Sequence, residues 1–397
     1  MCRVAMKSHI PAWHLANQRV IVRIDGNVPI DNGIILNDQR LLASMATINM
    51  LLDKDARIVV MTHLGRPHDH EPELSTKALL PWFLYAGYDV SFAASIQEAQ
   101  RLLDAGSTFV LLENVRFFKG ELDGDATFAQ ELATLGTYYV NDAFGTLHRN
   151  DSSIALLPAQ FDAQHKTIGL LVEHEMHMLD KIMKYKQKPF VAIIGGGKVH
   201  DKIPLIEKLL PQLSALLLGP GLCFTFLKAA GTSIGRSLLD STRIDLCKEI
   251  ILKAEQLRIP ILYPVDYIVA QNSYDGPLDL VDTKQIPAHD VGVSIGPKTA
   301  QQWAQHITQA KTILVNGLMG SLQRPETLTY VQDLYKIIAL SDATSVIAGG
   351  DSVAAAYAFN AARNISYLST GGGATLHYIA GQPLPGLEAL KDGTKAQ

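Results

Sequence analysis

The sequence predicts an α/β protein built from two parallel-sheet domains, and three observations lead to this class. Short β-branched runs alternate with longer segments of helical period, which is typical of βαβ units. The apolar strands are continuous rather than alternating, which indicates sheets covered on both faces. The chain of 397 residues is also too long for one ordinary core.

The strands and helices follow one another in both halves of the chain. In the first half we expect strands at 19–24, 57–61, 108–112 and 137–140, with helices at 40–52 and 128–135. In the second half we expect strands at 190–194, 215–218, 259–263, 312–315, 345–347 and 366–368, with helices at 203–210 and 352–363. β-branched side chains favour the strands because they pack well on a pleated surface.

The domain boundary is expected near residues 170–189. Leu171, Met178, Leu179 and Ile182 give this segment a helical pattern, and Lys-Gln-Lys-Pro then precedes a new strand. We therefore predict domains at 1–170 and 189–380, a connecting helix at 171–188 and a C-terminal segment at 381–397. The alternative is an ordinary surface helix inside one domain.

Charge and composition narrow the classes of function. A formal net charge of −4 argues against a general nucleic-acid binder, which usually shows a basic excess. The apolar runs fall far short of the roughly 18 residues that span a bilayer, and the N-terminus has no long apolar run of a secretory signal. Cys2, Cys223 and Cys247 have neither zinc nor disulfide spacing. We expect a cytoplasmic protein that binds neither nucleic acid nor membrane.

Nearly every predicted strand runs into a polar or glycine-rich turn. Ligands of open parallel sheets bind beyond the carboxyl ends of the strands, so these turns lie where binding residues are expected. For any single turn, the alternative is that Gly, Asn and Asp simply make a tight connection. The turns are at 25–27, 63–66, 113–116, 141–145, 195–198, 219–221, 316–317, 349–351 and 371–373.

The turns of the first half carry cations. Several arginines that converge on one cleft suit a small, multiply anionic ligand, because the guanidinium fork matches carboxylate and phosphate geometry. Each arginine taken alone would be read as a solvated surface residue. Arg23 lies inside a strand, so we expect a structural role for it. The other cations in or beside these turns are Arg40, His63, Arg66, Arg116, His148 and Arg149.

The turns of the second half carry glycines. The runs at 195–197, 349–350 and 371–373 each precede an expected helix, whose free N–H groups and positive dipole end attract phosphate. Lys198 and Lys202 could neutralise phosphate charge. Asp351 has two interpretations, an N-cap of the following helix or a ligand of Mg²⁺, which favours oxygen.

Other motifs are absent or weak. Neither GxxxxGK[ST] nor GxGxxG occurs, so the chain is not a P-loop enzyme or a standard dinucleotide binder by motif. His63, His68 and His70 have the spacing of a metal cluster, but their surroundings favour a solvated loop over zinc. His174 and His177 are better explained as a solvated helix face.

At these residues the chain closely resembles the phosphoglycerate kinase family, in order and over essentially its whole length. The segments that carry the resemblance are VRIDGNVP (22–29), MTHLGRP (61–67), LLENVRFFKGE (111–121), YVNDAFGTLHR (139–149), IIGGGKVHDKI (193–203), TFLKAAGTSIGRSL (225–238), SIGPKT (294–299), VNGLMG (315–320), AGGDSVAAA (348–356) and STGGGATLHYIAG (369–381).

The resemblance implies two Rossmann-like domains with a hinged cleft and reversible phosphoryl transfer between 1,3-bisphosphoglycerate and ADP. It implies Mg²⁺ and ATP or ADP as co-substrate, a monomer, and a C-terminal segment that packs on the N-terminal domain. The implied 3-phosphoglycerate ligands are Asp25, Asn27, Arg40, His63, Arg66, Arg116 and Arg149. The implied nucleotide ligands are Lys198, Lys202, Gly219, Gly221, Gly296, Asn316, Gln323, Gly350, Asp351, Ser352, Gly371, Gly372 and Gly373, with Asp351 on the metal.

The implied chemistry fits these residue types. The phosphoryl acceptor is a carboxylate that is already ionised at neutral pH, so no general base is needed. In-line positioning and charge neutralisation are needed instead. We assign these to Arg40 and Lys202, with Gly372 in the assisting helix end, and closure of the two domains would exclude water.

Several positions depart from the family pattern, and they motivate two rival interpretations. One is a catalytically impaired scaffold or surface-binding protein on the same fold. The other is a magnesium-dependent ligase or acid kinase that acts on a different small carboxylate. The departures are Gly26 for Phe, Asn150-Asp151 without the second His, Ser294 for Asp, Val315 for Trp, Leu318 for Pro and Gln323 for Glu.

Overall fold

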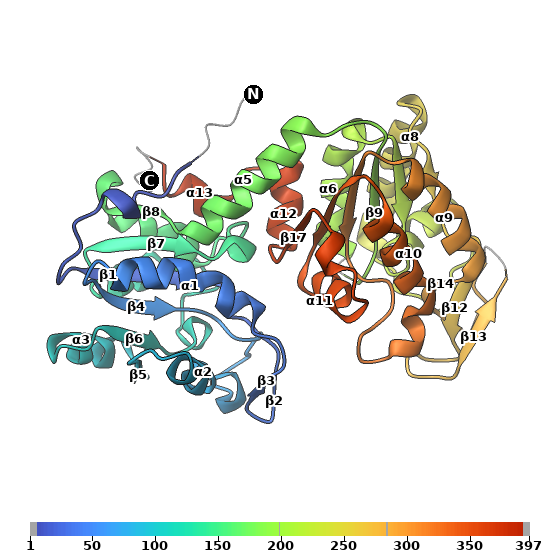
Figure 1. Cartoon of the computed structure of the whole chain (residues 1–397). Coiled ribbons are helices and arrows are strands. Elements are labelled where there is room, and N and C mark those ends of the chain that lie inside the picture. Colours follow the sequence, from blue (N-terminus) through green and yellow to red (C-terminus); the bar gives the residue numbers. More distant parts are fainter. Residues whose placement is uncertain (1–5, 198, 283–284, 392–397) are drawn as a thin grey trace. The chain divides into compact units, whose positions relative to one another are not determined.

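The computed structural model describes residues 6–197, 199–282 and 285–391. Within these residues the chain divides into two compact units. The second unit is Leu179–Gln382, and the first contains the chain up to Met178 together with the segment from Pro383 onward. Each unit contains its own parallel sheet (Figure 1).

The sheet of the first unit has six strands among the described residues, in the order β5-β6-β4-β1-β7-β8. The central strand β1 pairs in parallel with β4 on one side and β7 on the other. Its residues from Val20 to Ile24 are all buried, as expected for a sheet covered on both faces. The strands are β1 (Arg19–Ile24), β4 (Arg57–Met61), β5 (Ser91–Ala93), β6 (Phe109–Leu112), β7 (Tyr138–Asp142) and β8 (Lys166–Ile168).

Helices connect the strands, and side-chain caps fix two of their starts. Ser95 accepts the N–H of Glu98 at 3.1 Å, and Asp125 accepts the N–H of Thr127 at 2.7 Å. A short hairpin, β2 (Ile30–Asp31) and β3 (Ile34–Ile35), follows β1. The helices are α1 (Gln39–Leu52), α2 (Leu80–Tyr85), α3 (Ile96–Asp104) and α4 (Ala126–Ala133).

A helix of 16 residues, α5 (Leu170–Tyr185), carries the chain from the first unit into the second. The chain returns to the first unit at Pro383 and forms α13 (Pro385–Glu388). There the N–H of Gly386 donates to the carbonyl of Leu147 at 2.9 Å, and Lys166 Nζ donates to the carbonyl of Ala389 at 3.0 Å. The C-terminal segment is therefore held to β8 and to the loop after β7.

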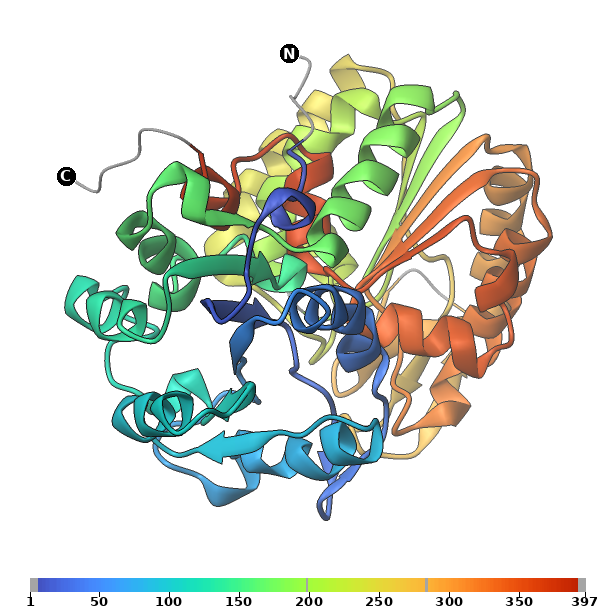
Figure 2. The same ribbon diagram turned by 60° about the vertical axis from the view of Figure 1, so that its left-hand side comes forward.

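The second unit has a six-stranded parallel sheet among its described residues, in the order β11-β10-β9-β15-β16-β17. Helices lie on both of its faces (Figure 2), and all residues of β9 and β15 are buried. The strands are β9 (Phe190–Ile194), β10 (Ala215–Leu218), β11 (Ile261–Leu262), β15 (Thr312–Asn316), β16 (Thr344–Ala348) and β17 (Tyr367–Ser369). The helices are α6 (Val199–Leu209), α7 (Cys223–Ala229), α8 (Ile244–Gln256), α9 (Pro297–Gln309), α10 (Thr329–Leu340), α11 (Gly350–Ala358) and α12 (Gly373–Ile379).

This unit differs from the sequence prediction in several elements, among them the helices α7 to α10, which no predicted helix covers. An antiparallel meander of β12 (Tyr267–Ala270), β13 (Leu278–Val281) and β14 (Val291–Ile295) was not predicted. The helix expected at 352–363 was wrong at its end, because α11 stops at Ala358. Asn360 adopts a left-handed conformation with φ 56°, and the N–H of Ala361 bonds back to the carbonyl of Ala356 at 2.9 Å, which ends a helix.

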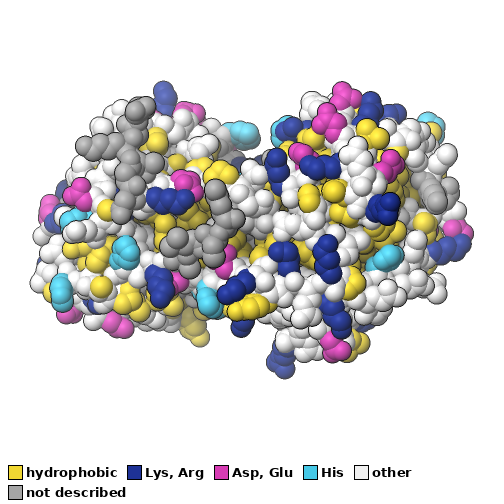
Figure 3. Space-filling model, turned by 90° about the horizontal axis from the view of Figure 1, so that it is seen from above, with side chains coloured by type: hydrophobic (Ala, Val, Ile, Leu, Met, Phe, Trp, Pro, Cys, Tyr) yellow, Lys and Arg dark blue, Asp and Glu magenta, His cyan; other side chains and the backbone are white. Residues whose placement is uncertain are grey.

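Within the described part of the chain, no helix combines the length and the apolar character that crossing a membrane requires. Lys, Arg, Asp and Glu side chains are interspersed over the face drawn in Figure 3.

Candidate functional site

Polar side chains gather at the carboxyl edge of the first sheet. Asp25 follows β1, His63 follows β4, Arg116 follows β6 and Arg149 lies in the loop after β7. Because β6, β4, β1 and β7 are neighbours in the sheet, their carboxyl ends meet at one edge. Arg40 reaches this edge from the first turn of α1.

Asp25, Asn27 and Arg40 form one hydrogen-bonded group. Nη1 of Arg40 lies 3.0 Å from each carboxylate oxygen of Asp25 and donates to the carbonyl of Asn27 at 3.3 Å. The side-chain oxygen of Asn27 accepts the N–H of Gly65 at 2.8 Å, which ties the group to the turn after β4. The Arg40 side chain stays 24% exposed, so its guanidinium is held in place and still accessible.

The buried His63 lies among the arginines of this edge. Its Nδ1 lies 3.4 Å from Nη2 of Arg23, which is fully buried in β1. Burial holds the pKa of His63 well below 6.5, and the charges of Arg23, Arg116, Arg149 and Arg40 lower it further. The imidazole is therefore neutral at physiological pH, and the four guanidinium groups produce a common positive field around it.

Arg116 carries buried donors that the protein does not satisfy. Nη1 donates to the carbonyl of Gly65 at 2.5 Å, but Nε and Nη2 have no hydrogen-bond partner within the described residues. The nearest carboxylate oxygen, Oδ2 of Asp151, lies 3.9 Å from Nη2. Burial and the charge of Arg149 lower the pKa of Arg116 to about 10. Unsatisfied buried donors on a cation are costly, and an anionic ligand would satisfy them.

Two predicted ligands of this edge are less tightly held. Arg149 is half-buried, and its Nε has no hydrogen-bond partner within the described residues. Arg66 follows Gly65 directly, but its side chain is exposed and makes no hydrogen bond or ion pair to the part of the chain described. The structure thus brings Asp25, Asn27 and Arg40 together with His63 and Arg116, and leaves Arg66 at the rim.

Sequence reasoning missed a buried network beneath the arginines. The carboxylate of Glu121 accepts the N–H of Ser153 at 2.9 Å and its hydroxyl at 2.6 Å, and the Ser153 oxygen accepts Nε–H of Arg23 at 2.8 Å. Glu121 is fully buried although its neighbours in KGELDGD look like a solvated loop. Asp151 was named only as part of a departure from the family pattern, and its ion pair with Arg116 was not predicted.

The glycine turns of the second unit lie at the carboxyl ends of neighbouring strands. Those after β9 and β10 are in close contact, since the N–H of Gly196 donates to the carbonyl of Pro220 at 2.9 Å. Those after β16 and β17 also meet, because a Cβ on Gly372 would lie 3.7 Å from Cα of Gly349. Gly219, Gly221, Gly350, Gly371 and Gly373 belong to these turns. Lys198 lies outside the described residues.

Lys202 lies beneath the turns of β9 and β15. Its Nζ donates to the carbonyl of Gly195 at 2.5 Å, and the side chain is 8% exposed. Gly317 makes this position possible, because it has φ +92° and a Cβ there would lie 2.2 Å from Nζ of Lys202. The sequence therefore folds a cation directly against two glycine-rich turns.

Asn316, Asp351 and Ser352 complete this edge. The side-chain amide of Asn316 donates to the carbonyl of Ala348 at 3.0 Å, and the Ser352 hydroxyl accepts the N–H of Gly317 at 2.9 Å. The N-cap of α11 is Gly349, so the capping role considered for Asp351 is wrong. The Asp351 carboxylate is exposed in the first turn of the helix and has no hydrogen-bond partner within the described residues.

Gly296 and Gln323 are placed differently from the other predicted nucleotide ligands. Gly296 follows β14 of the meander, and its N–H donates to the carbonyl of Asp266 at 3.1 Å. Gln323 is exposed and accepts the Ser321 hydroxyl at 2.7 Å. Within the described chain, no hydrogen bond joins either residue to the glycine turns.

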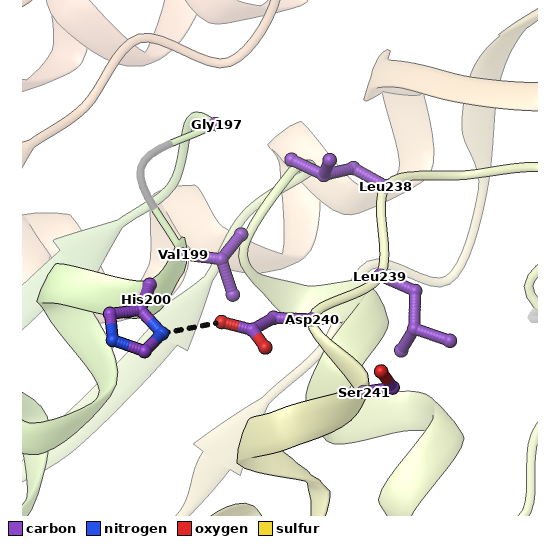
Figure 4. A pocket seen from close by; sticks show the side chains of 7 residues that line it. All are labelled: Gly197, Val199, His200, Leu238, Leu239, Asp240 and Ser241. Carbon is purple, nitrogen blue, oxygen red and sulfur yellow. Dashed lines mark hydrogen bonds and ion pairs between the residues drawn. The ribbon is translucent and has the colours of Figure 1, made fainter.

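A cavity of about 310 Å³ opens beside Gly197. Val199, Leu238 and Leu239 supply apolar wall, while His200 and Asp240 face each other with Nδ1 and Oδ2 3.1 Å apart (Figure 4). The cavity therefore adjoins the turn after β9 and has both an apolar and a polar side.

The zinc interpretation finds no support in the part of the chain described. No group of three or more His, Cys, Asp and Glu side chains there could hold a metal ion by itself.

Two of the departures from the family pattern, Val315 and Leu318, lie in the apolar core of the second unit. Val315 replaces a larger residue of the family, and Leu318 replaces a stiffer one.

The two parallel sheets, with arginines at the carboxyl edge of one and glycine turns at that of the other, have the architecture of a two-domain α/β phosphotransferase. The phosphoglycerate kinase family model matches residues 10–382. The chain belongs to the phosphoglycerate kinase family.

Relatives and solved structures give the same result over nearly the whole chain. The chain is 38% identical over 401 residues to "Phosphoglycerate kinase" of Koribacter versatilis, covering 97% of this chain and 99% of the relative. It is 36% identical to that of Dictyoglomus turgidum, covering 95% and 96%. The phosphoglycerate kinase structure from Coxiella burnetii matches with TM-score 0.75 and 33% identity over 96% of this chain and 97% of that one. That from Pyrococcus horikoshii matches with TM-score 0.82 and 27% identity over 96% and 97%.

Proposed function

We propose that this protein catalyses reversible phosphoryl transfer from 1,3-bisphosphoglycerate to ADP, giving 3-phosphoglycerate and ATP. The observation that carries the proposal is the contrast between the two sheet edges. One presents a buried arginine with two unsatisfied donor nitrogens, and the other presents glycine turns around a lysine. Two different anionic substrates fit this division, and family membership supports it.

In this proposal the first unit binds the glycerate substrate. Arg116, Arg149 and Arg66 would neutralise its phosphate and carboxylate, because guanidinium groups bind such oxyanions through paired N–H donors. Asp25 and Asn27 hold Arg40 through the contacts at 3.0 and 3.3 Å and so orient its free N–H groups. The neutral His63 would act as a hydrogen-bonding partner without adding charge.

The second unit would bind the nucleotide. The free N–H groups of the glycine turns, above all at the start of α12, are suited to phosphate oxygens. The cavity beside Gly197 would accept the base against Leu238 and Val199. Both sites would come together on closure of a hinge, which would exclude the water that otherwise takes the phosphoryl group.

The catalytic work falls on charge and position. Arg40 and Lys202 would stabilise the negative charge of the moving phosphoryl group, and the N–H groups of the Gly372 turn would assist. Each is a preorganised donor, and loss of one such donor typically costs about 100- to 1000-fold in rate. The carboxylate acceptor is already ionised, so no residue has to remove a proton.

Mg²⁺ is the metal that this site suits. Mg²⁺ usually binds through one or two carboxylates together with water and substrate phosphates, and Asp351 supplies an exposed carboxylate without a protein partner among the described residues. When bound, the ion would neutralise phosphate charge of the nucleotide. A monomeric state and a cytoplasmic location stay predictions.

A coupled assay of ATP formation from 1,3-bisphosphoglycerate and ADP tests the function. We expect turnover that falls about 100- to 1000-fold in Lys202→Ala. Lys208→Ala, an exposed lysine on the same helix, is the matched control and should keep wild-type activity. Wild-type turnover no better than that of Lys202→Ala would favour the scaffold interpretation.

A substrate screen separates the remaining rival. In the ATP-consuming direction the enzyme should prefer 3-phosphoglycerate over acetate and aspartate, because its arginine edge offers more cations than a single carboxylate needs. A clear preference for acetate or aspartate would overturn the proposal in favour of a different acid kinase or ligase.

A further inference from the structure

Helix α12 carries the Gly371–Gly373 turn at its start, between β17 and the body of the helix, and the turn lies against the one that contains Gly349. The Ser369 hydroxyl accepts the N–H of Gly371 at 3.2 Å and lies 2.6 Å from the Thr375 hydroxyl. Gly372 has φ 54° and ψ −110°, a conformation that costs other residues strain. The position of the turn therefore depends both on β17, which leads into it, and on where the rest of the helix is held.

The other end of α12 is fixed by a side-chain contact to a different element. The Tyr378 hydroxyl donates to Oδ1 of Asp180 at 2.8 Å, and the Tyr378 side chain is only 4% exposed. Asp180 is half-buried in α5. A hydrogen bond to a charged acceptor of this kind is stronger than one between neutral groups.

The helix that contributes Asp180 is also the covalent connection between the two units. Helix α5 is continuous from Leu170 to Tyr185, and the division of the units falls between Met178 and Leu179. Asp180 lies in the first turn beyond that division. The Tyr378–Asp180 bond thus joins the connecting helix to the helix that begins at the catalytic glycines.

We propose that Tyr378 and Asp180 are positioning residues for phosphoryl transfer, because their hydrogen bond fixes α12 on the connecting helix and so sets the Gly371–Gly373 turn. The proposal rests on the phosphoglycerate kinase function. Neither side chain need touch a substrate. Their effect passes through the N–H groups of the turn, which must meet the phosphoryl group within a fraction of an ångström.

Steady-state kinetics of Tyr378→Phe and Asp180→Ala test the proposal. Each should lower kcat about tenfold and leave both KM values within about twofold, because the turn acts on the transition state more than on ground-state binding. The double variant should be no slower than either single variant, since all three lack the same bond. Asp180→Asn keeps an acceptor oxygen and should recover most of kcat.

The matched control is Tyr357→Phe on α11, whose half-exposed hydroxyl has no hydrogen-bond partner among the described residues. It should keep wild-type kcat. Unchanged kcat in Tyr378→Phe, or a double variant whose loss is the product of the single losses, would overturn the proposal.

Hydrogen exchange of the nucleotide-free protein provides a second readout that does not need activity. Amides of residues 371–375 should exchange faster in Tyr378→Phe than in wild type, and those of α11 should not change. If the wild-type protein showed no kinase activity, the proposed function would fail, and faster exchange would still identify the bond as the restraint on the turn. Unchanged exchange at 371–375 would refute the positioning role in either case.

Discussion

At the scale of single residues, His63 makes the stability of the protein sensitive to acid. Burial and four nearby arginines hold its pKa well below 6.5, whereas in the unfolded chain it takes up a proton near pH 6.5. Below that pH the unfolded state binds more protons than the folded state, so stability falls as the pH falls.

Unfolding in urea at pH 7.5 and 5.5 measures this effect. From pH 7.5 to 5.5 we expect His63 to cost about 1.4 kcal/mol of the free energy of unfolding. His63→Gln keeps a hydrogen-bond acceptor for Arg23 but does not titrate, so it should lose less stability over the same interval. Equal losses in both proteins would show that His63 is protonated in the folded state.

How far sequence predicts this site depends on where the partner of each residue lies. Asp25, His63 and Arg116 each follow a strand, so their chemistry and their common edge could be predicted together. Glu121 acts through Ser153, which lies 32 residues further along the chain and outside any strand. No local pattern predicts such a contact, because it arises only when the loops after β6 and β7 pack together.

At the scale of elements, Asp142 fixes the start of the connecting helix. It ends β7, and its Oδ1 accepts the N–H groups of Leu171 at 2.9 Å and Val172 at 3.3 Å in the first turn of α5. The other oxygen, Oδ2, is buried with no hydrogen-bond partner in the described residues. Burial therefore raises the pKa of Asp142 to about 7, despite the hydrogen bonds that lower it.

This raised pKa predicts a pH dependence opposite in sign to that of His63. In the unfolded chain Asp142 ionises near pH 3.8, so between pH 3.8 and 7 the folded state binds more protons, and its contribution to stability is lost as the pH rises. From pH 5 to 7 we expect a loss of about 2 kcal/mol from this group. Asp142→Asn cannot ionise and should not show it. Parallel stability curves of the two proteins over this interval, followed by circular dichroism, would rule the effect out.

The elements themselves were predicted best where the sheet is parallel and buried. The predictions for β1, β4, β9 and β10 match the structure at both ends, since continuous apolar runs bounded by turns define such strands clearly. The meander was missed because β13 is largely exposed and its pairing is antiparallel. The hydrophobic signal of β13 is correspondingly weak, whereas β12 and β14 are mostly buried and no predicted segment covered them.

At the scale of the whole molecule, each unit has its own sheet and its own apolar core, and the proposed ligands divide between them. Binding of one ligand should therefore be separable from binding of the other by substitution. Arg66 and Asp351 are suited to this test because both side chains are exposed, so replacing them should cost little stability.

Isothermal calorimetry on the full-length variants measures the division. Arg66→Ala should weaken 3-phosphoglycerate binding about tenfold, equivalent to about 1.4 kcal/mol, and leave ADP with Mg²⁺ unaffected. Asp351→Ala should weaken the binding of ADP by a similar factor when Mg²⁺ is present. Without Mg²⁺ the loss of affinity should be much smaller, because the carboxylate acts through the metal. Loss of nucleotide binding in Arg66→Ala with 3-phosphoglycerate binding intact would reverse the assignment of the units. If Asp351→Ala instead weakened the affinity for ADP equally with and without Mg²⁺, Asp351 would not act through the metal. The assignment of the nucleotide to the second unit would stand.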